Sequence, residues 1–566
     1  MDLVVARAGD RVEVVAVTDG EAGERWSVPW ADLPAWVQAR ESVAETAGDD
    51  TPRWVWADSA ATYLPLLEAG VRVRRGVDLG LQRALLRRAR AVAHTPYAAA
   101  PSTEWDAQRA EAALVPAQPV DTDETLFDVA GDGPGIEECL AEHLAQREAL
   151  ADARDGGGLA LLCHAESTGG LIAQELNHAG VPFSTAVHDA QLTALLGERD
   201  RHGGRPARMA ALVERIRDLL GAPGLNPDSA PTLVTALRRA GLDVASTRKW
   251  ELRGIDHPVI EPLLEYKALS RLHTANGWAW MRHWVREERF RPDWVAGGVV
   301  TGRWASRGGG ALQLPRQIRS AVRADAGWRL VVADAAQLEP RVLAAMAGDA
   351  AMAEAGAAGD LYAALVDDGV VDTRDHAKVA MLGAMYGSTT GEAGALMPRL
   401  RRAYPRAIGL VDAAAAAGER GEAVSTWLGR TSPPPPRRWH RAQEAAQQPG
   451  ASAEVERRAR SMAREWGRFT RNFVVQGTAA EWALCWMGHL RRRLDDGYRH
   501  LPADERPQLV YFLHDEVIVH APADLADEVA EHVRQAARSA GELLFPSSAV
   551  DFPLSVAVVE SYDRAK

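Results

Sequence analysis

A short apolar run is followed directly by the carboxylate of Asp334 in Val331-Val332-Ala333-Asp334-Ala335-Ala336-Gln337-Leu338-Glu339-Pro340-Arg341. The β-branched residues at its start predict a buried strand that ends at Asp334. A carboxylate at the end of a strand is well placed to bind a metal ion. The same Asp could instead cap the Ala-rich helix that follows, since Asp is a common first residue before a helix. This stretch alone leaves both interpretations open.

A second stretch carries two more carboxylates. Leu509-Val510-Tyr511-Phe512-Leu513-His514-Asp515-Glu516-Val517-Ile518-Val519-His520 contains two apolar runs joined by a polar turn, which predicts a β-hairpin with its acids at the tip. Adjacent carboxylates repel one another, and a divalent cation relieves that repulsion. Mg²⁺ prefers carboxylate and water oxygens together with substrate phosphates. Asp334 and Asp515 are therefore a candidate pair for phosphoryl chemistry.

Three motifs in this order resemble those of family A DNA polymerases, the bacterial DNA polymerase I group. The first is Asp334-x-x-Gln337-x-Glu339-x-Arg341, and the third is His514-Asp515-Glu516. The second lies between them as Arg374-Asp375-His376-Ala377-Lys378-Val379-Ala380-Met381-Leu382-Gly383-Ala384-Met385-Tyr386-Gly387. Three ordered motifs are far more specific than any one of them.

Length and composition set the bounds of this interpretation. A chain of 566 residues should hold two or more domains, and 47% hydrophobic with 25% charged residues is typical of a soluble globular protein. The sequence shows neither a membrane-length apolar run nor a secretory signal, which predicts a cytoplasmic protein without membrane contact. The three cysteines are far apart, which argues against a disulfide framework and a Cys-based zinc site.

The net charge of -12 does not itself indicate nucleic-acid binding. The segment from Thr301 to Arg323 nevertheless contains five arginines and no acid. It is either a solvated loop or a cationic track for phosphates.

The resemblance implies an α+β protein with a right-hand polymerase fold of palm, fingers and thumb, preceded by a degenerate RNase H-like 3′–5′ exonuclease-type α/β domain. The expected ranges are 1–160 for the exonuclease-like domain and 161–566 for the polymerase domain, with the thumb at about 166–291, the palm at about 292–345 and 467–566, and the fingers at about 346–466.

The N-terminal region lacks most of what proofreading requires. Asp19-x-Glu21 has the spacing of the first exonuclease motif, but it lies where two strands must reverse, which predicts a turn. The other carboxylates needed around two metal ions are not recognisable. We therefore expect an exonuclease-like fold without proofreading. A bifunctional enzyme that still proofreads remains the alternative.

Four residues of the second motif are spaced by four. Arg374, Lys378, Leu382 and Tyr386 project from nearly one helical face, because four residues turn an α-helix by roughly 400°. The resemblance implies that this face binds the incoming nucleotide, with Arg374 and Lys378 at the triphosphate. An ordinary amphipathic helix is the alternative.

The resemblance also assigns the remaining roles. Two Mg²⁺ ions would be held by Asp334 and Asp515, with Glu516 and Lys378 supporting catalysis. Glu339 and Tyr386 would exclude a ribose 2′-hydroxyl, and Gln337 would help to bind the nucleotide. The residues expected to contact DNA are Arg303, Gln313, Arg341, Arg468, Asn472, Gln476, His514 and Lys267. The implied partners are primer–template DNA and dNTPs, and the protein is expected to be a monomer.

The sequence departs from the family at several positions. Leu382 stands where an aromatic residue normally contacts the nucleotide sugar, and Tyr362 stands at the position of a common phosphate-binding His. Neither change removes a metal ligand. A third hypothesis is a degenerate polymerase fold that only binds primer–template, and the retained Asp334, Lys378 and Asp515 argue against it.

Overall fold

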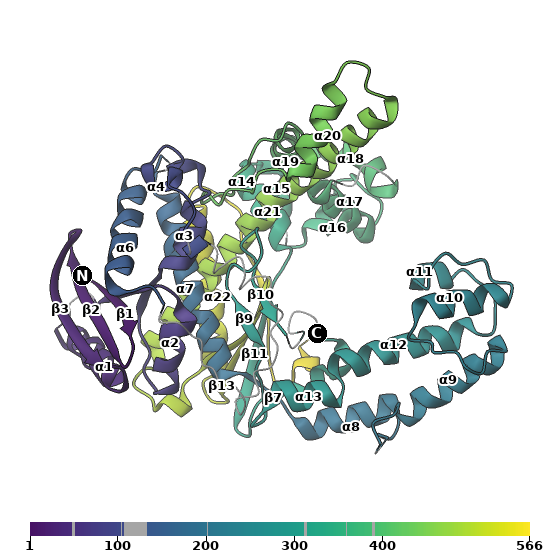
Figure 1. Cartoon of the computed structure of the whole chain (residues 1–566), viewed down its shortest axis with the longest axis horizontal. Coiled ribbons are helices and arrows are strands. Elements are labelled where there is room, and N and C mark those ends of the chain that lie inside the picture. The colour runs from purple at the N-terminus through teal and green to yellow at the C-terminus, as the bar shows by residue number, and fades with distance from the viewer. Residues whose placement is uncertain are drawn as a thin grey trace. The chain divides into compact units, whose positions relative to one another are not determined.

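The chain divides into two compact units. The computed structural model describes residues 1–47, 51–103, 105–106, 133–154, 156–200, 202–308, 310, 314–357, 359–387 and 391–565. Unit 1 contains residues 1–179, 294–307 and 327–558, and unit 2 contains residues 180–293, 308–326 and 559–566. The elements of both units are drawn in Figure 1.

Unit 1 begins with a five-stranded sheet in the order β3-β2-β1-β4-β5. Strand β1 pairs antiparallel with β2 and parallel with β4, and β4 pairs parallel with β5. The elements of this region are β1 (Asp2–Ala8), β2 (Arg11–Thr18), β3 (Glu21–Pro29), α1 (Leu33–Ala47), β4 (Arg53–Trp56), α2 (Ser59–Glu68), β5 (Arg75–Asp78), α3 (Leu79–Leu86), α4 (Pro96–Ala99), α6 (Ile136–Ala151) and α7 (Gly158–Ala179).

Both faces of this sheet are covered. Successive side chains of a strand point to opposite faces. Leu3 and Val5 of β1 therefore join one buried cluster with residues of α1 and α2, whereas Val4 and Ala6 join a second cluster with Ile136 of α6. The middle of β1, Leu3 to Ala6, is continuously apolar because it lies between two helical layers.

The predicted turn at Asp19 and Glu21 is confirmed. Thr18 pairs with Glu21 across the β2–β3 hairpin, and the two residues between them, Asp19 and Gly20, have φ values of 53° and 88°. Two positive φ values are the signature of a type I′ turn, for which Asp-Gly is a favoured pair. Asp19 and Glu21 are exposed at the tip.

The bounds of helix α7 do not coincide with the expected domain limits. It crosses both residue 160 and residue 166, and it ends at Ala179, the last residue before unit 2. The helix packs on β5, α2 and α3 at the N-terminal sheet, and on α21 and β12 further along the chain. Its buried face, which includes Leu171 and Leu176, holds it in unit 1. The unit that contains the expected thumb accordingly starts at Gly180.

The second sheet of unit 1 has the order β12-β13-β11-β14. It and the elements beside it are β9 (Asp293–Val295), β10 (Ala305–Arg307), β11 (Trp328–Ala335), α21 (Ala453–Tyr498), β12 (Gln508–Leu513), β13 (Glu516–Pro522), α22 (Ala526–Leu544) and β14 (Leu554–Val559). Helix α22 packs on β11 and β13, and α21 packs on α22. The 46-residue helix α21 runs through the expected fingers–palm limit at 466 without a break.

Within the described residues, seven helices between β11 and α21 form the region expected to be the fingers. They are α14 (Leu338–Ala347), α15 (Ala350–Ala357), α16 (Leu361–Asp367), α17 (Arg374–Tyr386), α18 (Gly391–Ala403), α19 (Pro405–Glu419) and α20 (Arg437–Gln447). Their shared core includes the fully buried Met381, Met385 and Phe473, and the last of these comes from α21. The long helix therefore links this region to the sheet.

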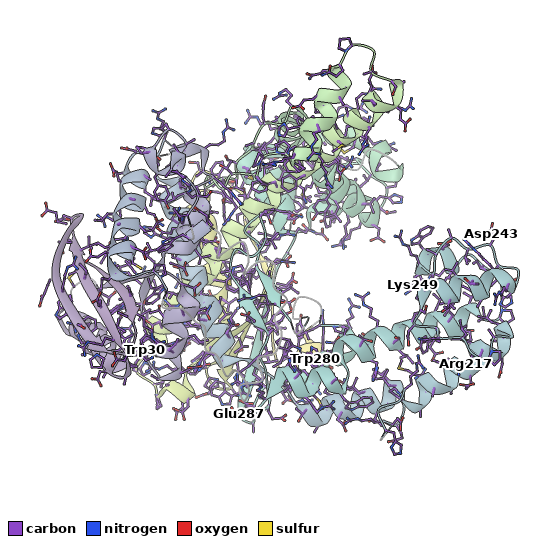
Figure 2. The ribbon with its side chains drawn as sticks, viewed as in Figure 1. Trp30, Arg217, Asp243, Lys249, Trp280 and Glu287 are labelled. Carbon is purple, nitrogen blue, oxygen red and sulfur yellow. The ribbon has the colours of Figure 1, made fainter. Side chains whose placement is uncertain are left out.

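Unit 2 is mostly helical. Its elements are β6 (Val181–Pro182), α8 (Thr185–Leu196), α9 (Ala207–Leu220), α10 (Ala230–Arg239), α11 (Lys249–Leu252), α12 (Ile260–Asn276), α13 (Trp278–Trp284), β7 (Val285–Arg286) and β8 (Arg289–Phe290). Figure 2 shows Trp280 and Glu287 toward one end of the unit and Asp243 and Lys249 at the other. Trp280 packs on Phe183 and Phe290 there. Among the described residues, no helix is both long enough and apolar enough to span a membrane.

Candidate active site

Strand register brings three carboxylates together. β11 pairs antiparallel with β13, and Asp334 lies directly opposite Glu516. One residue further on, the Ala335 N–H donates to the Asp515 carbonyl at 2.8 Å. Glu516 is 3% exposed, whereas Asp334 and Asp515 are half-buried. The end of the central strand and the tip of the neighbouring hairpin thus form one acidic site.

The backbone on both sides of this site adopts strained conformations. His514 has a φ of 55°, and the Asp515 N–H donates to the Leu513 carbonyl at 2.6 Å, which defines a γ-turn of the rare positive-φ kind. Gln337, which precedes α14, also has a φ of 55°. Non-glycine residues in this region cost roughly 1–3 kcal/mol each and cluster at functional sites.

The Gln337 side chain forms two hydrogen bonds that hold its strained backbone in place. Its Nε2 donates to Asp360 Oδ1 at 2.6 Å, and its Oε1 accepts from the Leu361 N–H at 3.0 Å. Asp360 also accepts from Arg374 Nε at 2.7 Å, and this bond raises the pKa of Arg374. Gln337 and Arg374 are therefore joined through one carboxylate that the sequence did not single out.

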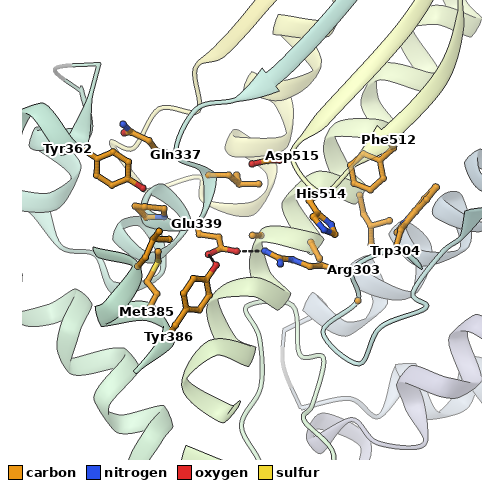
Figure 3. A pocket seen from close by; sticks show the side chains of 17 residues that line it. Arg303, Trp304, Gln337, Glu339, Tyr362, Met385, Tyr386, Phe512, His514 and Asp515 are labelled. Carbon is orange, nitrogen blue, oxygen red and sulfur yellow. Dashed lines mark hydrogen bonds and ion pairs between the residues drawn. The ribbon is translucent and has the colours of Figure 1, made fainter. Parts of the chain in front are cut away.

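A pocket of about 210 Å³ lies beside the carboxylates, and residues of α14, α17 and α21 line it together with Asp515. Arg303 forms an ion pair with Glu339 inside it, and the Tyr386 hydroxyl donates to Glu339 Oε2 at 2.7 Å. Figure 3 shows this chain of three side chains next to His514 and Asp515. Burial, and then the Glu339 charge, raise the pKa of Tyr386, so its hydroxyl keeps its proton and acts as the donor.

The second motif forms the predicted helix, α17. Thr373 caps its start by accepting from the His376 N–H, and Gly387 ends it with a φ of 71°. Leu382 and Tyr386 line the pocket. Lys378 is exposed, and no hydrogen bond or ion pair to it is present within the described part of the chain. The face expected to bind a nucleotide therefore runs from the solvent-facing cations to the pocket.

Tyr362 also lines the pocket, at the position where the family commonly has a His. Burial, together with the nearby Glu339 charge, raises the pKa of Tyr362 to about 12. The Arg374 guanidinium lies 5.6 Å from the centre of its ring. This side chain keeps a neutral hydroxyl at any physiological pH.

Three residues of helix α21 were expected to touch primer–template. Arg468 is exposed beside Gly387, and Asn472 and Gln476 are half-buried one and two turns further on. Gln476 lies within hydrogen-bonding reach of Tyr386, so this face reaches the pocket. The Oδ1 atom of Asn472 is buried without a hydrogen-bond partner among the described residues.

Two of the expected DNA contacts, Arg341 and Lys267, have other positions. Arg341 is 1% exposed, and its guanidinium donates to the carbonyls of Ala336, Gly356, Asp551 and Gly359. It is a structural residue, which corrects the expectation that it contacts DNA. Lys267 donates from Nζ to Thr247, at 2.7 Å to both the carbonyl and the hydroxyl, and ties α12 to a loop of unit 2. Gln313 lies outside the described residues.

A buried charge network near the pocket escaped the sequence analysis. Arg430 Nη2 donates to Glu166 Oε2 at 2.6 Å, and the Leu428 N–H donates to Glu481 Oε2 at 3.0 Å. The Arg430 guanidinium packs on Gly302, where an added Cβ would lie 2.6 Å from Cζ. The network therefore supports the turn that precedes Arg303. Its members are separated by up to 315 residues, so no local motif could reveal it.

The donor set at the strand ends fits magnesium. Mg²⁺ is usually bound by one or two carboxylates, with substrate phosphates and water completing an octahedron. Asp334 and Asp515 supply two such carboxylates beside the pocket. Within the described ranges, no group of three or more His, Cys, Asp and Glu side chains is arranged to hold a metal ion. A metal ion at this site would thus need oxygen ligands from the substrate.

Comparison with known proteins defines the class. Residues 206–563 match the model of DNA polymerase family A, and the chain belongs to this family. It is 26% identical over 399 residues to the thermostable DNA polymerase I of Thermus filiformis. This match covers 65% of this chain and 43% of that protein. It is 27% identical over 405 residues to DNA polymerase I of Chloroflexus aurantiacus, covering 62% and 40%. The chain spans less than half the length of these curated relatives.

A solved structure supports the fold over the whole chain. The POL domain of Pol1 from M. smegmatis, determined in complex with DNA primer–template and dNTP, matches with a TM-score of 0.69 at 19% identity. The match covers 100% of this chain and 95% of that one. The expected α+β polymerase fold is confirmed by this likeness and by the family match.

Proposed function

We propose that this protein is a DNA-directed DNA polymerase that adds deoxynucleotides to a primer 3′-hydroxyl. The observation that carries the proposal is the register of β11 against β13, which places Asp334 opposite Glu516 and beside Asp515, a residue that lines the pocket. A strand end bearing one acid and a hairpin tip bearing two can supply carboxylates for two-metal phosphoryl transfer. Primer–template DNA and dNTPs are the proposed substrates, and a monomer in the cytoplasm is the proposed state.

Asp334 and Asp515 would hold two Mg²⁺ ions, and Glu516 would support them from its buried position. When bound, such ions lower the pKa of an attacking hydroxyl and stabilise the charge on the transferring phosphoryl group. Arg374 and Lys378 would neutralise the triphosphate, because cationic side chains stabilise phosphoryl transfer by electrostatics and positioning.

The pocket network would position the sugar of the incoming nucleotide. Tyr386 and Glu339 are hydrogen-bonded, so an extra ribose 2′-hydroxyl would meet a pair of side chains that already satisfy each other. Leu382 presents an aliphatic side chain to the same pocket. We infer a preference for deoxynucleotides that rests on Glu339 and Tyr386 rather than on Leu382.

The N-terminal sheet would be an exonuclease-like domain without proofreading activity. Two-metal nucleases need carboxylates that converge on one site. Asp19 and Glu21 instead lie exposed in a type I′ turn. Helix α7 would connect this domain rigidly to the polymerase part, since it packs on both sheets.

Primer extension tests the proposal. A labelled primer on a DNA template, with Mg²⁺ and all four dNTPs, should be extended by the wild type and not by Asp515→Asn, which preserves shape and removes the charge. Asp524→Asn is the matched control, because Asp524 is an exposed acid beyond the far end of β13. A wild type that binds the duplex but never extends it would favour the accessory-binder alternative. Shortening of the primer when dNTPs are withheld would favour the bifunctional one.

A further inference from the structure

A carboxylate outside the three sequence motifs is bonded to the first residue of α17. Asp360 precedes α16, and its Oδ1 atom caps that helix by accepting from the Tyr362 N–H at 2.9 Å and from the Ala363 N–H at 3.3 Å. The same oxygen accepts from Gln337 Nε2 at 2.6 Å. These N–H donors hold the carboxylate in place, and its second oxygen, Oδ2, is directed to Arg374.

Arg374 meets Asp360 through a single nitrogen. Its Nε donates to Oδ2 at 2.7 Å, and within the described part of the chain neither Nη nitrogen forms a hydrogen bond. A guanidinium group has five N–H donors in a planar fork, and about four of them belong to the two Nη nitrogens. Asp360 therefore orients Arg374 and leaves a pair of nitrogens that can bind a phosphate bidentately.

The oriented guanidinium group lies at the edge of the pocket. Its centre is 5.6 Å from the centre of the Tyr362 ring, and Tyr362 lines the pocket together with Gln337. Figure 3 shows these two side chains on the same side of the pocket. The Arg374 side chain is 56% exposed, so an anion can reach its Nη nitrogens from solvent.

Asp360 also relates the position of Arg374 to that of the strand that carries Asp334. Gln337 follows Asp334 by three residues. Its side chain joins the end of this strand to the start of α16, because its Nε2 donates to Asp360 and its Oε1 accepts from the Leu361 N–H at 3.0 Å. A movement of Arg374 relative to the strand would have to break one of these hydrogen bonds.

We propose that Asp360 is a positioning residue that holds Arg374 so that its two Nη nitrogens face the phosphates of the incoming nucleotide. This inference rests on the proposed polymerase function and extends it to a residue that does not itself touch the substrate. Ordering a free side chain on binding weakens affinity about 2–10-fold, a cost that prior orientation removes. Because both side chains are partly exposed, solvent screens the Asp360 charge, and its repulsion of phosphate is the smaller effect.

The variant Asp360→Asn removes the charge and keeps the helix cap. Asn caps helices as well as Asp does, so its Oδ1 can still accept from the N–H groups of α16, whereas its amide nitrogen cannot accept from Arg374. In primer extension, KM for dNTP should rise about 2–10-fold with kcat within about twofold, because a contact made equally in the ground and transition states changes KM alone. Tripolyphosphate carries the phosphates without sugar or base. Added as its Mg²⁺ complex, it should inhibit the variant with an inhibition constant about 2–10-fold higher.

A double-mutant cycle with Arg374→Gln separates positioning from a structural role. In the Arg374→Gln background, Asp360→Asn should change KM and the inhibition constant by less than about twofold, since no guanidinium group remains to be oriented. Asp349→Asn is the matched control. Asp349 caps α15 by accepting from the Met352 N–H at 3.2 Å, as Asp360 caps α16. Its variant should keep the inhibition constant within about twofold of the wild type.

Four results would overturn the inference. A loss of affinity that persists in the Arg374→Gln background, or that Asp349→Asn reproduces, would assign Asp360 to the stability of the fold. Tighter inhibition of Asp360→Asn would show that the carboxylate competes with phosphate for Arg374. A wild type that extends primers, with both constants unchanged in Arg374→Gln, would overturn the inference and leave the polymerase proposal intact. A wild type that never extends a primer would overturn both.

Discussion

Two hairpins of unit 1 carry acids at their tips and differ in almost every other respect. The β2–β3 hairpin places Asp19 and Glu21 in solvent, and β3 is the edge strand of its sheet. The β12–β13 hairpin places Asp515 and Glu516 next to the sheet interior, because β13 lies between β12 and β11. The second pair lies beside a third acid, Asp334, which belongs to another strand. An acidic tip becomes a candidate metal site through its neighbours.

The two turns show the same contrast in their backbones. Asp19 and Gly20 adopt a type I′ geometry that their residue types favour, so this turn needs no support. His514 also adopts a positive φ, and the residue that follows it in the turn is Asp515 rather than glycine. Its pKa is lowered by burial and by the Arg303 charge, so the imidazole is neutral at pH 7. The buried hairpin differs from the exposed one in its γ-turn, which the Asp515 N–H closes by donating to the Leu513 carbonyl.

The largest expected effect tests whether Asp334 and Asp515 act as one unit. Asp334→Ala and Asp515→Ala should each reduce the rate of nucleotide addition at least about 1,000-fold, and the double variant should be no slower, since groups that act together are strongly non-additive. Asp19→Ala/Glu21→Ala should stay within about twofold of the wild type. Single-turnover primer extension measures all four. Additive losses in the double variant would contradict a shared metal site.

Substitution of Arg341 tests whether this buried charge stabilises the fold or binds DNA. Arg341→Lys keeps the charge but cannot reach all four carbonyls, so we expect the free energy of unfolding to fall by about 2–4 kcal/mol. The Kd for primer–template should remain within about twofold. Urea unfolding and anisotropy give the two values. A stable variant with weakened DNA binding would restore the role expected from the sequence.

Glu481 shows that burial of a carboxylate does not by itself make a reaction centre. Burial raises its pKa to about 7, against the opposing effects of Thr426, Leu428 and Arg430. The folded protein therefore binds more protons than the unfolded chain between about pH 4.5 and 7, and the stabilising contribution of Glu481 is lost as pH rises through this window. Relative to Glu481→Gln, the wild type should lose about 3 kcal/mol of unfolding free energy from about pH 4.5 to 7.

Denaturant unfolding of both proteins at about pH 5 and pH 8 measures this difference. Comparison with the Gln variant cancels the titration of other groups. Equal pH dependence in the two proteins would show that Glu481 remains ionised at neutral pH in the folded state.

The smallest expected effect concerns substrate choice in the pocket beside the buried hairpin. Glu339→Ala should raise ribonucleotide incorporation relative to deoxynucleotide incorporation about 10–100-fold, because it removes the acceptor that holds Tyr386 in place. Tyr386→Phe, which keeps the ring and loses only the hydroxyl, should raise it less. The ratio of kcat/KM values for matched nucleotide pairs is the measurement. An unchanged ratio in Glu339→Ala would remove this pair from sugar selection.

The features that could be predicted from the sequence are those fixed by local pattern. The strand that ends at Asp334, the hairpin at Asp515, the Asp19 turn and helix α17 all follow from periodicity and turn chemistry within a few residues. The burial of Arg341 could not be predicted in this way, because it depends on a carbonyl 210 residues away, that of Asp551.

The bounds of two helices could not be predicted from the expected domain limits for a related reason. Helices α7 and α21 continue across the expected limits at 160 and 466 because each is held by contacts on both sides of its limit. The charge network of Glu166, Arg430 and Glu481 likewise joins segments that only the tertiary fold brings together.

One labelled-primer experiment tests most directly whether only the buried hairpin performs chemistry. A 3′-mismatched primer–template is incubated with Mg²⁺ and the wild type, first without dNTPs and then with them, beside Asp515→Ala and Asp19→Ala/Glu21→Ala. We predict no shortening by any of the three, followed by extension by the wild type and the Asp19/Glu21 variant alone. Shortening by the wild type that disappears in Asp19→Ala/Glu21→Ala would contradict the account.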